Sequence, residues 1–234
     1  MEVIVAKSAG FCFGVKRAVD KVYEVANNKN VYTFGPIIHN EEVVADLNSK
    51  GVQVLENIEE LQKISEGTIV IRSHGVEKSI YTAIENQGLE IVDATCPFVL
   101  KIHRIVEEDS MAGNQIVIIG NEKHPEVVGI MGWCVNEPKV IESTQEAEFL
   151  QLSEDRKVSI VSQTTFNYNK FKDLVEIISK KGYDVCVYNT ICNATEERQT
   201  EARDLAQSVD AMVVIGGKNS SNTQKLYEIS KKEC

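Results

Sequence analysis

Short apolar runs alternate with longer amphipathic segments along this chain, and no other feature constrains its fold as strongly. The apolar runs include "EVIVA", "VYTFG", "TIVIRS", "EIVDA", "QIVIIG", "KVSIVSQ", "YDVCVY" and "AMVVIGG". Segments with helical spacing lie between them, such as "VKRAVDKVYEVANN" and "NEEVVADLNSKG". Continuous apolar strands separated by helices are typical of parallel sheets that are covered on both faces. The sequence therefore predicts an α/β fold.

Size and charge exclude several classes of protein. The chain has 234 residues, of which 43% are hydrophobic, so it can bury a full core. A formal net charge of −10 argues against a nucleic-acid partner, whose phosphates would be repelled. No stretch approaches the roughly 20 apolar residues of a membrane span, and the first residues lack the apolar region of a signal peptide. We expect a cytoplasmic protein with no membrane partner and with reduced thiols.

Three of the six cysteines occupy the same place in the alternating pattern. Cys12, Cys96 and Cys192 each end an apolar run and precede a helical segment, at spacings of 84 and 96 residues. This spacing indicates an internal repeat of about 90 residues. Ligands of parallel α/β units bind beyond the carboxyl ends of the strands. Three such units around a pseudo-threefold axis would therefore bring three thiolates to one point.

The repeat divides the chain into three small α/β domains, and the third is incomplete at its C-terminal end. A second strand ends in glycine 23 or 24 residues after each cysteine, at Gly35, Gly120 and Gly216. A third strand end follows at His74 and Thr164 in the first two units, whereas the chain stops before the equivalent position of the third. We expect the chain to be a piece of a longer protein. The predicted domains are residues 13–96, residues 97–192, and residues 193–234 together with 1–12.

The three repeated cysteines predict a site for a soft metal. Thiolates suit such metals, and a cubane iron–sulfur cluster held by three cysteines keeps one iron open for substrate. The alternatives are three unrelated buried cysteines or a structural zinc site. Cys134 and Cys186 lack the repeated position and are predicted to be core or surface residues, and Cys234 is terminal.

Eight motifs carry a family resemblance over the whole chain. They are "AGFCFGVKRAV", "GPIIHN", "IRSHGV", "DATCPFV", "GNEKHPEVVGIMGW", "SQTTFN", "NTICNATEERQ" and "GGKNSSNT". Together they resemble the 4-hydroxy-3-methylbut-2-enyl diphosphate reductases of the non-mevalonate isoprenoid pathway. The resemblance implies a trefoil of three α/β domains around a 4Fe-4S cluster, with Cys12, Cys96 and Cys192 as its ligands. It also implies two-electron removal of an allylic hydroxyl, which gives isopentenyl and dimethylallyl diphosphate, with a small electron-donor protein of the ferredoxin or flavodoxin type.

A diphosphate carries several negative charges, so its pocket needs hydrogen-bond donors and cationic imidazoles. Three of the four histidines fall at repeated positions, and the family places its diphosphate contacts there. His103 lies within a predicted helix and is interpreted as an ordinary helix residue. The predicted substrate-binding residues are His39, His74, His124, Ser220, Ser221 and Asn222.

Loss of the hydroxyl group requires a proton, which a carboxyl group can supply. Glu126, two residues after His124, resembles the proton-relay glutamate of the family; the alternative is a helix-start charge stabilised by the helix dipole. Thr164 is predicted to orient the substrate hydroxyl, so the predicted catalytic residues are Glu126, His124 and Thr164. The "GGKNSS" segment lacks the phosphate-loop pattern, so nucleotide binding is not favoured.

One alternative function belongs to another class. The chain could be an iron–sulfur or redox-sensing module that keeps its cluster but is catalytically impaired because its C-terminal part is missing. Cluster absorbance would separate iron–sulfur from zinc, and substrate turnover would separate an enzyme from a sensor.

Overall fold

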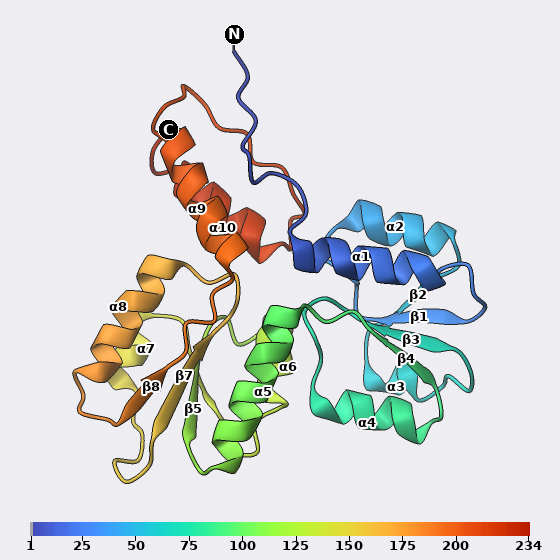
Figure 1. The fold of residues 1–234 in the computed structure, drawn as a ribbon, viewed down its shortest axis with the longest axis horizontal. Helices are drawn as coiled ribbons and strands as arrows, with labels where there is room; N and C mark the ends of the chain where they lie inside the picture. Colours follow the sequence, from blue (N-terminus) through green and yellow to red (C-terminus); the bar gives the residue numbers. More distant parts are fainter. Residues whose placement is uncertain (1) are drawn as a thin grey trace.

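Two parallel four-stranded sheets form the centres of two lobes in the computed structural model, which describes residues 2–234 (Figure 1). The strand order is β2-β1-β3-β4 in the first sheet and β6-β5-β7-β8 in the second. Every pairing in both sheets is parallel. The two sheets therefore repeat one topology, and the predicted α/β class is confirmed.

The first lobe packs a hydrophobic cluster on each face of its sheet. Val70 of β3 belongs to the cluster under α1 and α2, whereas its neighbours Ile69 and Ile71 belong to the cluster on the other face. This division follows from the alternation of side chains along a strand. The elements are α1 (Phe13–Val25), β1 (Val31–Phe34), α2 (Glu41–Ser49), β2 (Gln53–Leu55), α3 (Ile58–Leu61), β3 (Thr68–Ile71), α4 (Lys78–Asn86) and β4 (Glu90–Asp93).

The second lobe is built in the same way around β7, whose five residues are all buried. Ile160 and Val161 of this strand belong to clusters on opposite faces of the sheet. The helix α8 ends shortly before Gly182, whose φ of 85° lies in the left-handed region that glycine adopts readily. The elements are α5 (Pro97–Met111), β5 (Gln115–Ile119), α6 (Pro125–Met131), β6 (Lys139–Ile141), α7 (Thr144–Phe149), β7 (Val158–Ser162), α8 (Tyr168–Ser179) and β8 (Val185–Val187).

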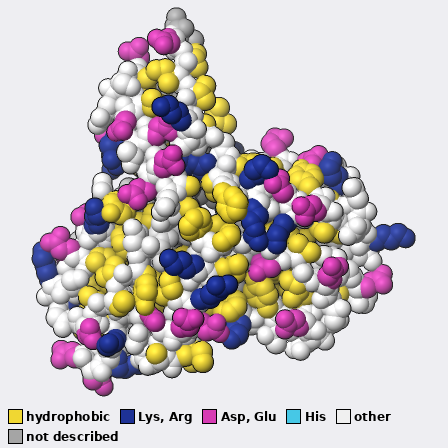
Figure 2. All heavy atoms as spheres, viewed as in Figure 1, with side chains coloured by type: hydrophobic (Ala, Val, Ile, Leu, Met, Phe, Trp, Pro, Cys, Tyr) yellow, Lys and Arg dark blue, Asp and Glu magenta, His cyan; other side chains and the backbone are white. Residues whose placement is uncertain are grey.

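A third part projects from the two lobes and contains α9 (Asn193–Ala206), α10 (Ser221–Ser230) and the N-terminal segment (Figure 1). The strands expected at residues 2–6 and 211–215 are not formed in the described chain. A strand requires a neighbour for its backbone hydrogen bonds, and neither segment pairs with another strand here. Val213 and Ile215 are accordingly 82% and 90% exposed. Figure 2 shows hydrophobic side chains on the surface of this projecting part.

The N-terminal segment is attached to the third part by polar contacts with α9. The Glu201 carboxylate accepts hydrogen bonds from the backbone N–H groups of Lys7 and Ser8, at 2.6 and 2.9 Å. Arg198 donates to the carbonyl groups of Ser8 and Gly10, at 3.0 and 2.6 Å. These contacts agree with grouping residues 1–12 with the third domain, whose exact boundaries stay a prediction.

Among residues 2–234, no helix is both long enough and apolar enough to cross a bilayer.

Candidate functional site

The three repeated cysteines lie at equivalent helix starts. Cys12, Cys96 and Cys192 are the residues that immediately precede α1, α5 and α9. The Cys96 N–H donates to the Ser73 carbonyl, and the Cys192 N–H donates to the Thr164 carbonyl, each at 3.0 Å. Each of these two cysteines is therefore fixed beside the end of a neighbouring strand, as expected from the repeat.

The thiols of the three cysteines lie close enough to influence one another. Burial raises the pKa of Cys96 and of Cys192, and neighbouring cysteines raise both further. A Cβ atom on Gly14, in the first turn of α1, would overlap the Sγ of Cys96. A positive metal centre among three thiolates would relieve this mutual repulsion. The three residues therefore fit a metal centre with three sulfur ligands.

Three imidazoles from two lobes form a cluster. His39 and His74 follow β1 and β3 of the first lobe, and His124 precedes α6 of the second. The ring centroids are 4.4 Å apart for His39 and His74, 5.8 Å for His39 and His124, and 5.6 Å for His74 and His124. One buried nitrogen of each ring has no hydrogen-bond partner among the described residues. The cluster therefore presents three unused polar atoms within a small volume.

The protonation of His124 distinguishes an anion site from a cation site. One ligand nitrogen from each ring lies within 4.8 Å of the others, which is close enough for a shared metal ion. However, Nδ1 of His124 accepts the Glu126 backbone N–H at 3.1 Å. In the neutral ring the proton is therefore on Nε2, which is a donor and has no lone pair for a metal. This hydrogen bond favours an anion.

The surroundings of the imidazoles oppose the charge predicted from the sequence. Burial lowers the pKa of His39, His74 and His124, to about 4 for His124. The Arg72 guanidinium lowers all three further. These shifts favour the neutral form of the three rings near pH 7, whereas the sequence predicts cationic imidazoles at a diphosphate site. Neutral rings still donate through one N–H each.

Glu126 and Thr164 form a buried pair at the junction of α6 and β7. Glu126 is 3% exposed, and its Oε1 accepts the Thr164 N–H at 2.5 Å. The Thr164 hydroxyl donates to Oε2 at 2.7 Å. Burial raises the pKa of Glu126 to about 7, although the two hydrogen bonds lower it. An exposed helix-start carboxylate would show neither the burial nor the raised pKa, so the dipole alternative is not supported.

The carboxyl group of Glu126 also lies near the cysteines and the histidines. Its charge contributes to the raised pKa of Cys192, and its own N–H binds the His124 ring. Thr164 in turn accepts the Cys192 N–H through its carbonyl. The predicted acid Glu126 is therefore connected through Thr164 to one predicted cluster ligand, Cys192. It is connected through its own N–H to one predicted substrate contact, His124.

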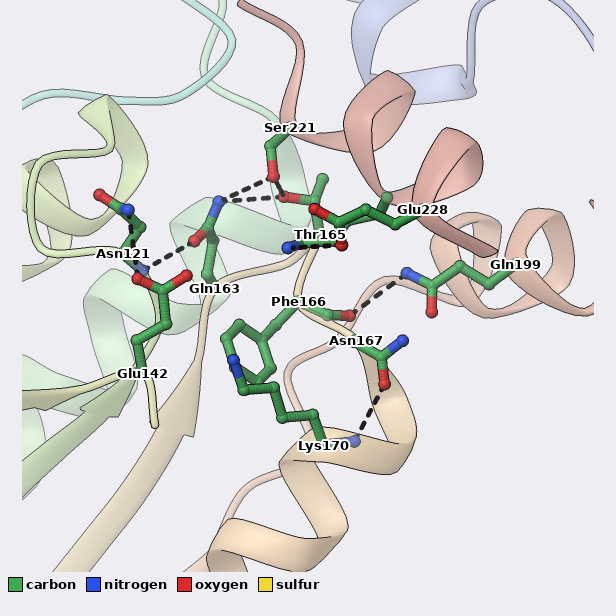
Figure 3. Close-up of polar contacts among 11 residues, drawn as sticks. Asn121, Glu142, Gln163, Thr165, Phe166, Asn167, Lys170, Gln199, Ser221 and Glu228 are labelled. Atoms are coloured by element: carbon green, nitrogen blue, oxygen red, sulfur yellow. Dashed lines mark hydrogen bonds and ion pairs between the residues drawn. The ribbon is translucent and has the colours of Figure 1, made fainter. Parts of the chain in front are cut away.

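The loop before α10 reaches the same region. Ser221 Oγ accepts hydrogen bonds from Thr165 Oγ1 at 2.9 Å and from Gln163 Nε2 at 3.4 Å (Figure 3). Ser220 caps α10 by accepting the Thr223 N–H. A Cβ atom on Gly217 would overlap the carbonyl of His39, so the loop packs directly against the first lobe. Ser221 therefore contacts the residues that flank Thr164, while Gly217 of the preceding loop contacts the first lobe at His39.

Sequence reasoning missed three polar residues of this region, although each lies in a motif already quoted. Gln163 and Thr165 flank Thr164 in "SQTTFN", and Arg72 precedes His74 by two residues in "IRSHGV". Adjacency to a predicted site residue was the available signal. His103 is buried in α5, where it stacks on Trp133 with ring centroids 5.0 Å apart, as suits the predicted helix residue.

Two proteins that are similar to this chain carry the same name. A protein of Caldanaerobacter subterraneus subsp. tengcongensis named 4-hydroxy-3-methylbut-2-enyl diphosphate reductase is 49% identical over 238 residues, covering 100% of this chain and 82% of the relative. A protein of the same name from Clostridioides difficile is 42% identical, covering 98% of this chain and 82% of the relative.

Solved structures of two reductases are also similar to this chain. The E-1-hydroxy-2-methyl-but-2-enyl-4-diphosphate reductase of Plasmodium falciparum has a TM-score of 0.90 at 28% identity, covering 95% of this chain and 71% of that one. A structure of (E)-4-hydroxy-3-methyl-but-2-enyl diphosphate reductase has a TM-score of 0.75 at 41% identity, covering 98% and 82%. The sequence matches the LytB protein family over residues 3–234. The chain therefore belongs to the LytB protein family.

Proposed function

We propose that this protein is a 4-hydroxy-3-methylbut-2-enyl diphosphate reductase of the non-mevalonate isoprenoid pathway. The reaction removes the allylic hydroxyl with two electrons and two protons, releases water, and forms isopentenyl or dimethylallyl diphosphate. The names of the relatives support this activity. The observation that carries the proposal is the buried Glu126–Thr164 pair, which links the histidine cluster to the cysteines.

We assign Cys12, Cys96 and Cys192 as the ligands of a 4Fe-4S cluster. When bound, the cluster would supply the electrons and an electrophilic iron for the departing hydroxyl group. The mutual proximity of the three thiols supports this ligand set, since the neighbouring cysteines contribute to the raised pKa of Cys96 and of Cys192. The electrons would come from a small protein of the ferredoxin or flavodoxin type.

The diphosphate of the substrate would bind to the histidine cluster. His39, His74 and His124 offer ring N–H groups, while Ser220, Ser221 and Asn222 offer hydroxyl and amide donors from the opposite side. Since His124 and Glu126 are joined by a hydrogen bond at the start of α6, anchoring the diphosphate also fixes the substrate relative to the acid. Such positioning converts binding energy into rate.

Glu126 would supply the proton for the leaving oxygen. Its Oε1 is occupied by the Thr164 N–H, so the proton resides on Oε2, which faces the Thr164 hydroxyl. The protonated Oε2 can donate a hydrogen bond to the Thr164 hydroxyl oxygen, whose own O–H then points to the leaving oxygen of the substrate. The proton of Glu126 can thus reach that oxygen through Thr164. A pKa of about 7 leaves a large fraction of Glu126 protonated at neutral pH, as a general acid requires.

The test is turnover by the chain reconstituted with iron and sulfide under anaerobic conditions. We expect it to convert 4-hydroxy-3-methylbut-2-enyl diphosphate into both products with a chemical reductant. Cys186→Ser, a change at an exposed cysteine, should leave turnover unchanged. A chain with a full cluster and bound substrate that forms no product would support the redox-sensing alternative.

A further inference from the structure

Arg72 is a partly buried cation whose position has no structural explanation in the fold alone. It follows β3, and its guanidinium covers Gly35 at the end of β1, where a Cβ atom would overlap it. Its Nε donates a long hydrogen bond of 3.4 Å to the Gly75 carbonyl. No carboxylate of residues 2–234 forms an ion pair with it. A partly buried charge without such a partner is costly unless a ligand compensates it.

The charge of the Arg72 guanidinium reaches all three imidazoles of the histidine cluster, and Arg72 lies two residues before His74 in the sequence. Its charge acts on His39, His74 and His124 alike, and Gly75, which accepts its hydrogen bond, directly follows His74. Burial lowers the pKa of all three imidazoles, which favours their neutral form, and one buried nitrogen of each has no hydrogen-bond partner among residues 2–234. The cluster thus has donors, and Arg72 adds a charge that does not depend on pH.

We propose that Arg72 supplies the permanent positive charge of the anion site formed by His39, His74 and His124. The imidazoles donate the hydrogen bonds, and Arg72 attracts the polyanion to them. The ligand class is a diphosphate monoester, for which charge attraction adds about tenfold or more to affinity, whereas the uncharged alcohol gains nothing from it. This inference rests on the proposed function, because it names a residue that acts at its substrate site.

Glu56 carries a negative charge that opposes the charge of Arg72. The proposal can therefore be tested by one variant that should weaken anion binding and by another that should strengthen it. Glu56 is exposed and follows β2, the strand that pairs with β1. Burial lowers the pKa of Arg72, and the Glu56 carboxylate partly opposes that shift. This carboxylate forms no ion pair with the guanidinium in the described chain. Removing its charge should therefore leave the fold intact and strengthen the field of Arg72 at the histidine cluster.

The experiment uses calorimetry to measure the binding of inorganic pyrophosphate to the chain loaded with its iron–sulfur cluster. We expect Arg72→Gln to weaken binding by at least about tenfold, and Arg72→Lys, which keeps the charge, to remain within about fivefold of the unaltered chain. Arg156→Gln is the matched control for net charge, because Arg156 is exposed and donates to the Gly113 carbonyl near the N-terminal ends of β5 and β7, whereas the site lies at the carboxyl ends of the strands. It should leave affinity unchanged.

Glu56→Gln should tighten pyrophosphate binding by about twofold to threefold. This variant tests the role of Arg72 even if Arg72→Gln does not fold. Unchanged affinity in a folded Arg72→Gln variant would overturn the role of Arg72, and so would unchanged or weaker affinity in Glu56→Gln. Failure of the unaltered, cluster-loaded chain to bind pyrophosphate would instead overturn the proposed diphosphate site.

Discussion

Glu126 shows how one side chain changes its chemistry with its surroundings. A glutamate after "HP" at a helix start would ordinarily be a solvated anion near the positive end of the helix dipole. In this fold β7 and Thr164 cover it, and burial raises its pKa to about 7. The same residue type that would stabilise a helix on the surface thereby becomes a proton donor near neutral pH.

Glu126→Gln should lower turnover by about 10²–10⁴-fold while cluster content and substrate affinity stay near those of the unaltered chain. The amide keeps the shape of the side chain and can still accept the Thr164 N–H, but it cannot release a proton. Steady-state kinetics, iron analysis and substrate titration measure the three quantities. Glu122→Gln, at an exposed position in the loop that precedes α6, is the matched control. Turnover near normal in Glu126→Gln would leave the proposed mechanism without its acid.

The raised pKa of Glu126 also predicts a pH dependence of stability. The folded state binds this proton more tightly than the unfolded chain, so its contribution is complete below about pH 4.5 and is lost as pH rises through about 7. Relative to Glu126→Gln, the metal-free chain should lose up to roughly 3 kcal/mol of unfolding free energy over this range. Urea unfolding of both proteins at several pH values measures the difference. A constant difference would mean that the carboxyl group is not perturbed by burial.

At the scale of the elements, helix starts position the reactive groups. Cys12, Cys96, Cys192, His124 and Ser220 each precede a helix directly. Cys96, His124 and Cys192 also lie beyond the carboxyl ends of β4, β5 and β8, where parallel α/β units place their ligands. Because the repeat places these residues at equivalent helix starts, their side chains come together in the folded chain.

Gly14→Ala should reduce cluster incorporation, because a Cβ at this position would overlap the Cys96 Sγ. The substitution would otherwise favour the helix, since alanine has the higher helix propensity by up to about 1 kcal/mol. Gly129→Ala is the matched control: it also lies in a helix, and its nearest neighbour would be 3.5 Å away, an ordinary contact. Iron and sulfide analysis after reconstitution compares the two. Equal cluster content would show that α1 does not approach the Cys96 thiol.

Much of this arrangement could be predicted from the sequence, because strand periodicity and cysteine spacing are local signals. The parallel sheets, the helix-start cysteines and the convergence of His39, His74 and His124 follow from the repeat. The lowered pKa values of the imidazoles could not be predicted, since they depend on burial by both lobes and on Arg72. The apolar run at 211–215 has strand composition but no pairing neighbour, and composition alone cannot supply one.

At the scale of the whole molecule, the site belongs to no single lobe. The first lobe contributes His39, His74 and Arg72, the second contributes His124 and Glu126, and the third part contributes the start of α10 with Ser221. Cys192, at the start of α9, joins the third part to the second lobe through its bond to Thr164. Any change in the relative position of these parts would therefore separate the acid, the anion site and the thiols together.

The central claim is that three thiols, one from each repeat, form one metal centre. The most direct test is the iron content and visible absorbance of anaerobically reconstituted variants in which one cysteine is replaced by serine. Replacing Cys12, Cys96 or Cys192 should abolish or severely reduce both signals, because a hydroxyl is a poor ligand for iron–sulfide. Replacing Cys134 or Cys186 should leave both unchanged. Equal iron loss in the two groups, or normal iron in any of the first three variants, would contradict the account.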